Sequence, residues 1–175
     1  RSAIPGGTCE FDLPAYFYWL NQEAASRTQA FNEWLALLRP LTDRPLLVNL
    51  GGDLVASGSR AEGQPWYVGV ERPTGDTQPD GVPAPAPAAA GLIALMAGGL
   101  ATSGDSRRFL LRDGLRYSHI LDARSGWPVT GAPRSVTVAA PTCTEAGLLA
   151  TLAMLQGEGA EALLAAQGLP HWVLR

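Results

Sequence analysis

The chain has 175 residues, of which 46% are hydrophobic and 17% charged, and its formal net charge is −3. This length and composition suit one globular domain with a sizeable core. The net charge is negative, whereas nucleic-acid-binding proteins usually carry a cluster of basic residues, so we expect no nucleic-acid partner. All thirteen basic residues are arginines, which excludes a catalytic lysine and a P-loop. No uninterrupted apolar run approaches the roughly 20 residues of a membrane helix.

The N-terminal part predicts one helix. Glu10–Phe17 begins with strand-like alternation that Pro14 interrupts. Trp19–Leu38 has apolar residues near a 3.6-residue spacing, and Pro40 ends it. We expect this helix to cover a sheet. Because the first residue is Arg1 rather than Met, we expect an N-terminus that is processed, trimmed or missing, and any targeting signal would be lost with it.

Short apolar or alternating runs predict strands along the rest of the chain. They are Leu46–Leu50, Leu54–Ala56, Pro65–Val70, Gly91–Met96, Ser135–Ala140 and His171–Leu174. Arg108–Arg112 and Leu115–Ile120 flank Asp113-Gly114, the strongest short hairpin signal. Gly98-Gly99 predicts a turn or bulge. Residues 71–90, rich in Pro, Gly and Ala, predict a flexible insertion within a single domain.

Two C-terminal helices complete the prediction. Thr144 is the expected cap of a helix that runs to Gln156, and a second helix covers Glu158–Gln167. One apolar face of the first helix is expected to be buried. Its residues are Ala146, Leu149, Ala150, Ala153 and Met154. Hairpins of strands with a few covering helices predict an α+β fold with a mainly antiparallel sheet.

The two cysteines are far apart in the sequence. Cys9 and Cys143 are compatible with a disulfide in an oxidising compartment and equally with two buried thiols, which is the commoner state.

Two glycine-containing segments are candidate ligand sites. In Ala101–Asp105 (ATSGD), hydroxyls and a flexible glycine could bind a phosphate, with Asp105 accepting from backbone amides; an ordinary turn explains the segment equally well. Gly51-Gly52-Asp53 follows a buried run and could bring backbone amides close to a ligand, although a plain turn is the commoner explanation.

His119 is the candidate acid or base. It is one of two histidines, and its alternation with Tyr117 and Leu121 puts the three on one side of a strand. A structural role is the alternative. Asp122 and Arg124 lie in the following turn, where either could face a ligand.

The third candidate is a metal site on the helix within Thr142–Thr151. Gly147 and Thr151 are four residues apart and share a helical face, so a hydroxyl and a carbonyl could serve Mg²⁺. Glu145 is the only nearby carboxylate and points elsewhere, which makes the site weak.

Together these segments resemble the ApbE family, the FAD:protein FMN transferases. Four ordered stretches carry the resemblance: LLVNLGGDLVASG from Leu46, LATSGD from Leu100, RYSHILDARSGWPV from Arg116 and SVTVAAPTCTEAGLLATLAMLQGEG from Ser135. The second and third resemble the ATSGD and YSHI-D-P segments of the family, and the last resembles its strand followed by an A-D-A-x-A-T helix.

The resemblance implies an ApbE-like (T-fold-like) α+β fold that binds FAD and Mg²⁺. The reaction it implies cleaves FAD and attaches FMN to a Thr or Ser hydroxyl of an acceptor flavoprotein, with AMP released. His119 is the implied base. The implied flavin contacts are Ser103, Gly104, His119, Ile120, Asp122, Gly52 and Asp53. Because many relatives are exported, the resemblance implies the periplasm or cell envelope, with membrane contact only through a partner or a missing N-terminal signal.

The sequence departs from the family pattern at the metal. Gly147 stands where the family has its metal-binding Asp, while Ala150 and Thr151 remain at the other ligand positions. The family's upstream flavin loop aligns only loosely with Asp12–Asn21, and we expect the N-terminal portion of the family domain to be missing. We therefore expect weakened or lost Mg²⁺ binding.

Two hypotheses follow. The first is an active transferase whose metal site is completed by Asp53, Asp122 or phosphate oxygens. The second is a catalytically degenerate flavin-binding, scaffold or assembly protein, such as a subunit of a larger complex.

Overall fold

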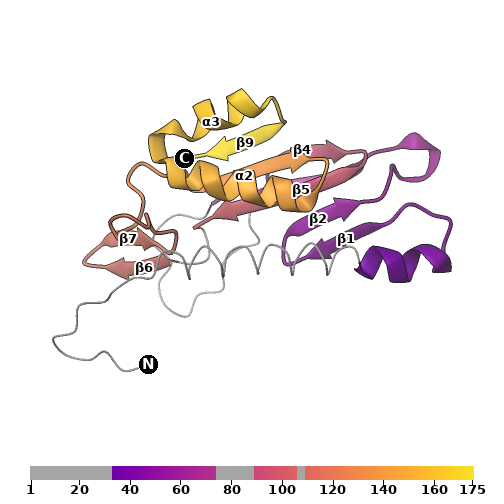
Figure 1. The fold of residues 1–175 in the computed structure, drawn as a ribbon, viewed down its shortest axis with the longest axis horizontal. Coiled ribbons are helices and arrows are strands. Elements are labelled where there is room, and N and C mark those ends of the chain that lie inside the picture. Colours follow the sequence, from indigo (N-terminus) through magenta and orange to yellow (C-terminus); the bar gives the residue numbers. More distant parts are fainter. Residues whose placement is uncertain (1–32, 74–88, 106–108) are drawn as a thin grey trace, which may run out of the picture.

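A computed structural model of the chain describes residues 33–73, 89–105 and 109–175 (Figure 1). Its centre is a five-stranded antiparallel sheet with the order β1-β2-β5-β8-β9. The strands are β1 (Leu47–Leu50), β2 (Asp53–Ala56), β5 (Gly98–Gly104), β8 (Ser135–Ala140) and β9 (His171–Leu174). The helices α2 (Cys143–Gln156) and α3 (Ala160–Gln167) are joined by the short 3-10 helix η3 (Gly157–Gly159).

Two antiparallel hairpins stand outside this sheet: β3 (Trp66–Glu71) with β4 (Ala89–Leu95), and β6 (Phe109–Arg112) with β7 (Leu115–Ser118). Two further 3-10 turns are η1 (Arg39–Leu41) and η2 (Ala61–Gly63). The structure confirms the predicted α+β class with antiparallel strands.

The two faces of the sheet have different cores. Side chains alternate between faces along each strand, so the pair Ala101 and Val138 faces one way and the pair Leu100 and Ala139 the other. The first pair packs with α2 and α3, where Ala146, Ala150 and Met154 are fully buried. The second pair packs with the β3–β4 hairpin. The sheet is therefore the middle layer of three, which fixes β5 between both cores.

The predicted buried face of α2 is confirmed, but the predicted cap is wrong. Thr142, not Thr144, is the N-cap: it has an extended backbone, and its Oγ1 accepts from the Glu145 N–H at 3.2 Å. Pro141 lies directly after β8, so the chain turns one residue later and α2 begins at Cys143. The helix therefore starts close against the sheet.

The largest correction concerns Gly98–Gly104. The sequence predicted a turn or bulge at Gly98-Gly99 and a second turn at ATSGD, whereas the structure has one seven-residue strand there. Only glycine fits at two of these positions. A Cβ on Gly104 would lie 2.7 Å from the Arg134 carbonyl oxygen, and a Cβ on Gly99 would lie even closer to backbone atoms of Cys143. The small residues of this segment therefore indicate that backbones pack closely here, and they do not indicate a turn.

Smaller corrections concern strand ends. The β7 strand stops at Ser118 rather than Ile120, because the Ser118 side chain accepts from the Ile120 N–H and turns the chain. The β6–β7 turn itself is confirmed, with positive φ at Asp113 and Gly114. Strands reach Glu71 and Ala89, so the predicted insertion at 71–90 is trimmed at both ends, and residues 74–88 lie outside the described part.

The predicted helix at Trp19–Leu38 is described only over its last turns, where residues 33–38 are helical. The predicted strand at Glu10–Phe17, the loosely aligned loop at Asp12–Asn21, and Cys9 lie outside the described residues. Cys143 is buried, in line with its thiol alternative.

One candidate for a membrane span emerges from the described residues. Cys143–Gln167 is long and apolar enough by length and composition, with 33% of its most apolar window buried. The sequence predicted no such span, because Glu158 and Glu161 interrupt the apolar residues of this stretch. In the fold the stretch comprises α2, η3 and α3, and Gly157 breaks it with a φ of +61°. Its buried side chains pack on the sheet, so we assign it to the core.

Candidate functional site

Two predicted segments, ATSGD and GGD, lie at the same end of the central sheet. β5 ends there with Ser103 and Gly104, paired with Val136 and Ser135 of β8. The GGD segment forms the two-residue turn between β1 and β2, and Asp53 begins β2 one residue beyond the pair Leu54–Leu100. The antiparallel register thus brings Asp53 to the same end of the sheet as Ser103.

The turn at Gly51-Gly52 is a true hairpin turn. Both glycines have positive φ, +66° and +103°, and the Gly52 N–H donates to Asn49 Oδ1 at 3.0 Å. Gly52 is exposed, and no atom lies within 4 Å of where its Cβ would be. The Cα side of Gly52 is therefore accessible to a ligand, although the Gly52 N–H already donates a hydrogen bond to Asn49.

A pair of hydroxyls links this end of the sheet to α2. Ser103 Oγ and Thr151 Oγ1 share a hydrogen bond at 2.7 Å, and both residues are partly buried. On the other face, Thr102 and Thr137 share a second hydroxyl bond at 2.8 Å. The sequence placed Ser103 and Thr151 in separate candidate sites, and the structure makes them one.

The residues at the implied metal position do not fit Mg²⁺ on their own. Gly147 has no ligand atom in a side chain, Ala150 is fully buried, and the Thr151 hydroxyl already bonds to Ser103. Among the residues that the structure describes, no cluster of three or more His, Cys, Asp or Glu could hold a metal ion. Mg²⁺ prefers charged oxygen ligands in octahedral geometry, which this set does not supply.

His119 lies beyond the end of β7 and is exposed. It lines an open pocket of about 390 Å³. The other lining residues are Phe109, Leu110, Tyr117, Ser118 and Leu121. Next to it, Ile120 turns inward and packs against the core of α2. An exposed imidazole on an anchored segment is accessible for proton transfer.

Asp122 is engaged by its own turn. Its Oδ1 accepts from the backbone N–H of Arg124 at 3.0 Å and from the guanidinium at 3.1 Å. The backbone hydrogen bond, followed by the guanidinium, lowers the pKa of the Asp122 carboxyl. Its backbone carbonyl accepts from Ser125 and Gly126. These bonds favour a structural part for Asp122.

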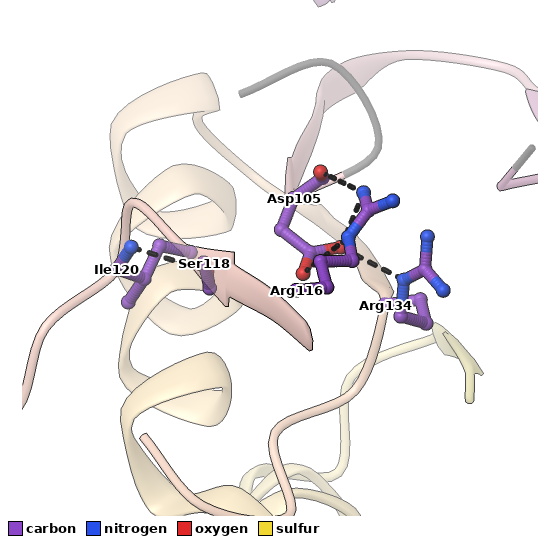
Figure 2. A network of polar contacts seen from close by, with 5 residues as sticks. All are labelled: Asp105, Arg116, Ser118, Ile120 and Arg134. Carbon is purple, nitrogen blue, oxygen red and sulfur yellow. Dashed lines mark hydrogen bonds and ion pairs between the residues drawn. The ribbon is translucent and has the colours of Figure 1, made fainter. Parts of the chain in front are cut away.

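Asp105 forms a buried ionic cluster that the sequence did not reveal (Figure 2). Its carboxylate accepts from Arg134 Nε at 2.9 Å and from Arg116 Nε and Nη2 at 3.3 Å each. Arg116 also donates to the Asp105 carbonyl and lies 3.5 Å over the Phe109 ring. Sequence reasoning gave Asp105 a turn role. The available signal was a carboxylate following a strand of small residues, but nothing indicated its partners.

Comparison with known proteins gives the family of this α+β domain. The ApbE family model matches residues 23–172, and the chain belongs to the ApbE family. A relative named FAD:protein FMN transferase from Klebsiella pneumoniae is 36% identical over 129 residues, which are 73% of this chain and 34% of the relative. This chain thus spans about a third of the length of such relatives.

Solved structures agree. The ApbE protein of Thermotoga maritima superposes with a TM-score of 0.68 at 28% identity, covering 86% of this chain and 46% of that one. The flavinyl transferase ApbE of Pseudomonas stutzeri, in its apo form, gives a TM-score of 0.65 at 31% identity, covering 87% and 45%.

A shorter similarity has a different character. The cell division protein ZapD of Dechloromonas aromatica is 48% identical over 48 residues, which are 27% of this chain and 19% of that protein. This coverage is too small to assign a second family.

Proposed function

We propose that this chain binds a flavin nucleotide at the end of the sheet formed by Ser103, Gly104 and the Gly51-Gly52 turn. The hydroxyl pair of Ser103 and Thr151, at the same end of the sheet as the Gly51-Gly52 turn, carries the proposal. Hydroxyls and glycines at a strand end suit a phosphate, and the Asp105–Arg116 ion pair joins the hairpin with the apolar His119 pocket to the residue after β5. Family membership supports FAD as the nucleotide, since relatives are named FAD:protein FMN transferases.

Transfer of FMN is the second candidate, and the exposed position of His119 favours it. In this reaction a Thr or Ser hydroxyl of an acceptor flavoprotein gives its proton to the imidazole. The hydroxyl oxygen then bonds to the FMN phosphorus, the pyrophosphate P–O bond breaks, and AMP leaves with the bonding electrons. His119 returns the proton to the departing phosphate or to water. Mg²⁺ would supply charge neutralisation, but the described residues do not fit it, so we rank binding above transfer.

One incubation separates the two candidates. The protein is mixed with FAD, Mg²⁺ and a threonine-containing acceptor peptide; FAD binding is followed by flavin fluorescence and the peptide by mass spectrometry. Saturable FAD binding without an FMN adduct supports the binding function alone. An adduct that His119→Ala abolishes, with FAD binding retained, supports transfer. Absence of saturable FAD binding contradicts the proposal.

Gly147→Asp tests the correspondence of α2 with the family metal helix. The Gly147 position accepts a Cβ, which would lie 3.7 Å from Ala101 Cβ, an ordinary contact. We expect the new carboxylate to raise Mg²⁺ affinity at least about tenfold, since it supplies the charged oxygen that the site lacks.

Isothermal titration with Mg²⁺ measures the change. Gly147→Ala is the matched control: it adds the Cβ and improves helix propensity by roughly 1 kcal/mol without adding a ligand, so Mg²⁺ affinity should stay at the wild-type value. Equal affinities in all three proteins would show that the correspondence is wrong.

A further inference from the structure

The β6–β7 hairpin carries the His119 segment, yet it does not belong to the central sheet. Its two strands pair with each other and with no other described strand. A two-stranded hairpin is marginally stable alone in water. Its leucines do not attach it to the body, because Leu110, Leu111 and Leu115 are 74%, 53% and 61% exposed. Another interaction must hold it in place.

The Asp105 cluster supplies that interaction. Asp105 follows β5, Arg116 lies on β7, and Arg134 precedes β8, so three separate segments meet at one carboxylate. Asp105 is 6% exposed, and the side chains of Asp105 and Arg116 are each 9% exposed. The Asp105 N–H also donates to the Arg134 carbonyl at 3.1 Å. Buried charges with several hydrogen bonds have little freedom to rearrange.

His119 lies between two anchors. On its N-terminal side Arg116 is fixed by Asp105, and on its C-terminal side Ile120 is packed in the α2 core. Three residues of extended chain, roughly 10 Å, separate Arg116 from His119. If the first anchor is lost, the segment keeps only the second and can rotate about it.

We propose that Asp105 is a positioning residue of the flavin site. Through Arg116 it sets the place of β7, and hence of His119 and its pocket, relative to the hydroxyls at the end of β5. The role in ligand binding rests on the flavin function proposed above, while the positioning of His119 exists in the protein without ligand.

The test combines one spectroscopic and one binding measurement on Asp105→Asn, which keeps the shape but loses the charge. NMR follows the His119 ring signals in flavin-free protein; the chain has two histidines, and His119→Gln identifies the relevant signal. We expect a shifted or broadened His119 signal and FAD affinity reduced about tenfold, the size expected for losing a charge-assisted hydrogen bond.

Asp113→Asn is the matched control. It makes the same chemical change in the same hairpin, in an ion pair with Arg112 whose side chains are 87% and 83% exposed. Its His119 signal and FAD affinity should equal those of the wild type. Unchanged His119 signals in a folded Asp105→Asn protein, or equal changes in both variants, would overturn the proposal.

Arg116→Lys tests the same interaction from its other side, and it replaces Asp105→Asn if that variant does not fold. Lysine retains the charge but not the planar fork that bonds Asp105, so the His119 signal must still move. A wild-type protein that does not bind FAD would refute the proposed function, and the NMR comparison would still decide the positioning role.

Discussion

At the scale of single residues, Gly99 decides how closely α2 approaches the sheet. A Cβ at this position would lie 2.2 Å from the Cys143 nitrogen and 2.4 Å from its Cα, both backbone atoms. We expect Gly99→Ala to lower the free energy of unfolding by at least about 3 kcal/mol, at the upper end for overpacking, because backbone cannot yield as a flexible side chain can. Urea unfolding followed by circular dichroism measures the loss.

The control for this prediction is Gly91→Ala on β4. No atom lies within 4 Å of a Cβ at Gly91, so its effect should stay within about 0.5 kcal/mol. Similar losses in the two variants would mean that α2 does not begin against β5 as described.

At the scale of elements, one ion pair joins α3 to the residue after β9. Arg175 Nη2 lies 2.6 Å from Glu161 Oε2, and the same guanidinium donates to the carbonyls of Gly131 and Gly157. The hydrogen bond from Arg175 lowers the pKa of Glu161 from 4.5 to about 2. The stabilisation is therefore complete above pH 4.5 and is lost as the pH falls towards 2.

This sign predicts a pH-dependent difference between the wild type and Glu161→Gln. The wild type should be the more stable protein above pH 4.5, and the difference should shrink towards pH 2; thermal unfolding across this range measures it. Because the pair is exposed, the difference should be modest. Glu145→Gln, which leaves the pair intact, should keep the wild-type profile, and a constant gap for Glu161→Gln would contradict the assignment.

At the scale of the whole molecule, stability should be unevenly distributed. β5 and β8 lie between two cores, with Leu100, Val136 and Val138 essentially inaccessible to solvent, whereas β6 and β7 form an exposed hairpin. In native-state hydrogen exchange we expect amides of β5 and β8 to exchange only through global unfolding, and those of β6 and β7 through a smaller local opening. Equal protection of the two groups would mean that the hairpin unfolds together with the sheet.

The sequence predicted features that depend on neighbouring residues. The turn at Asp113-Gly114, the strand at Ser135–Ala140 and the buried face of α2 follow from local propensity and period, and the structure confirms them, although β8 is buried on both faces. Ser103, Thr151 and Gly52 stay predicted site residues, and nothing in the sequence indicated that Ser103 and Thr151 bond to each other.

What depends on distant residues could not be predicted. ATSG has the composition of a turn, and it is a strand because it pairs with β8, which lies so close that a Cβ at Gly104 would have no room. Asp105 meets partners 11 and 29 residues away, and no local period relates such separations. Long-range packing therefore decided both the central strand and the ionic cluster.

The course of β5 has a consequence for how substitutions accumulate. Within a few residues the strand changes from apolar contacts at Leu100 and Ala101, through hydroxyl pairs at Thr102 and Ser103, to a buried charge at Asp105. Its first half packs in the two cores, and its second half contributes polar groups that bond within the fold. Substitutions of the two hydroxyl residues can therefore alter the polar end of the strand while the apolar cores at its other end stay packed.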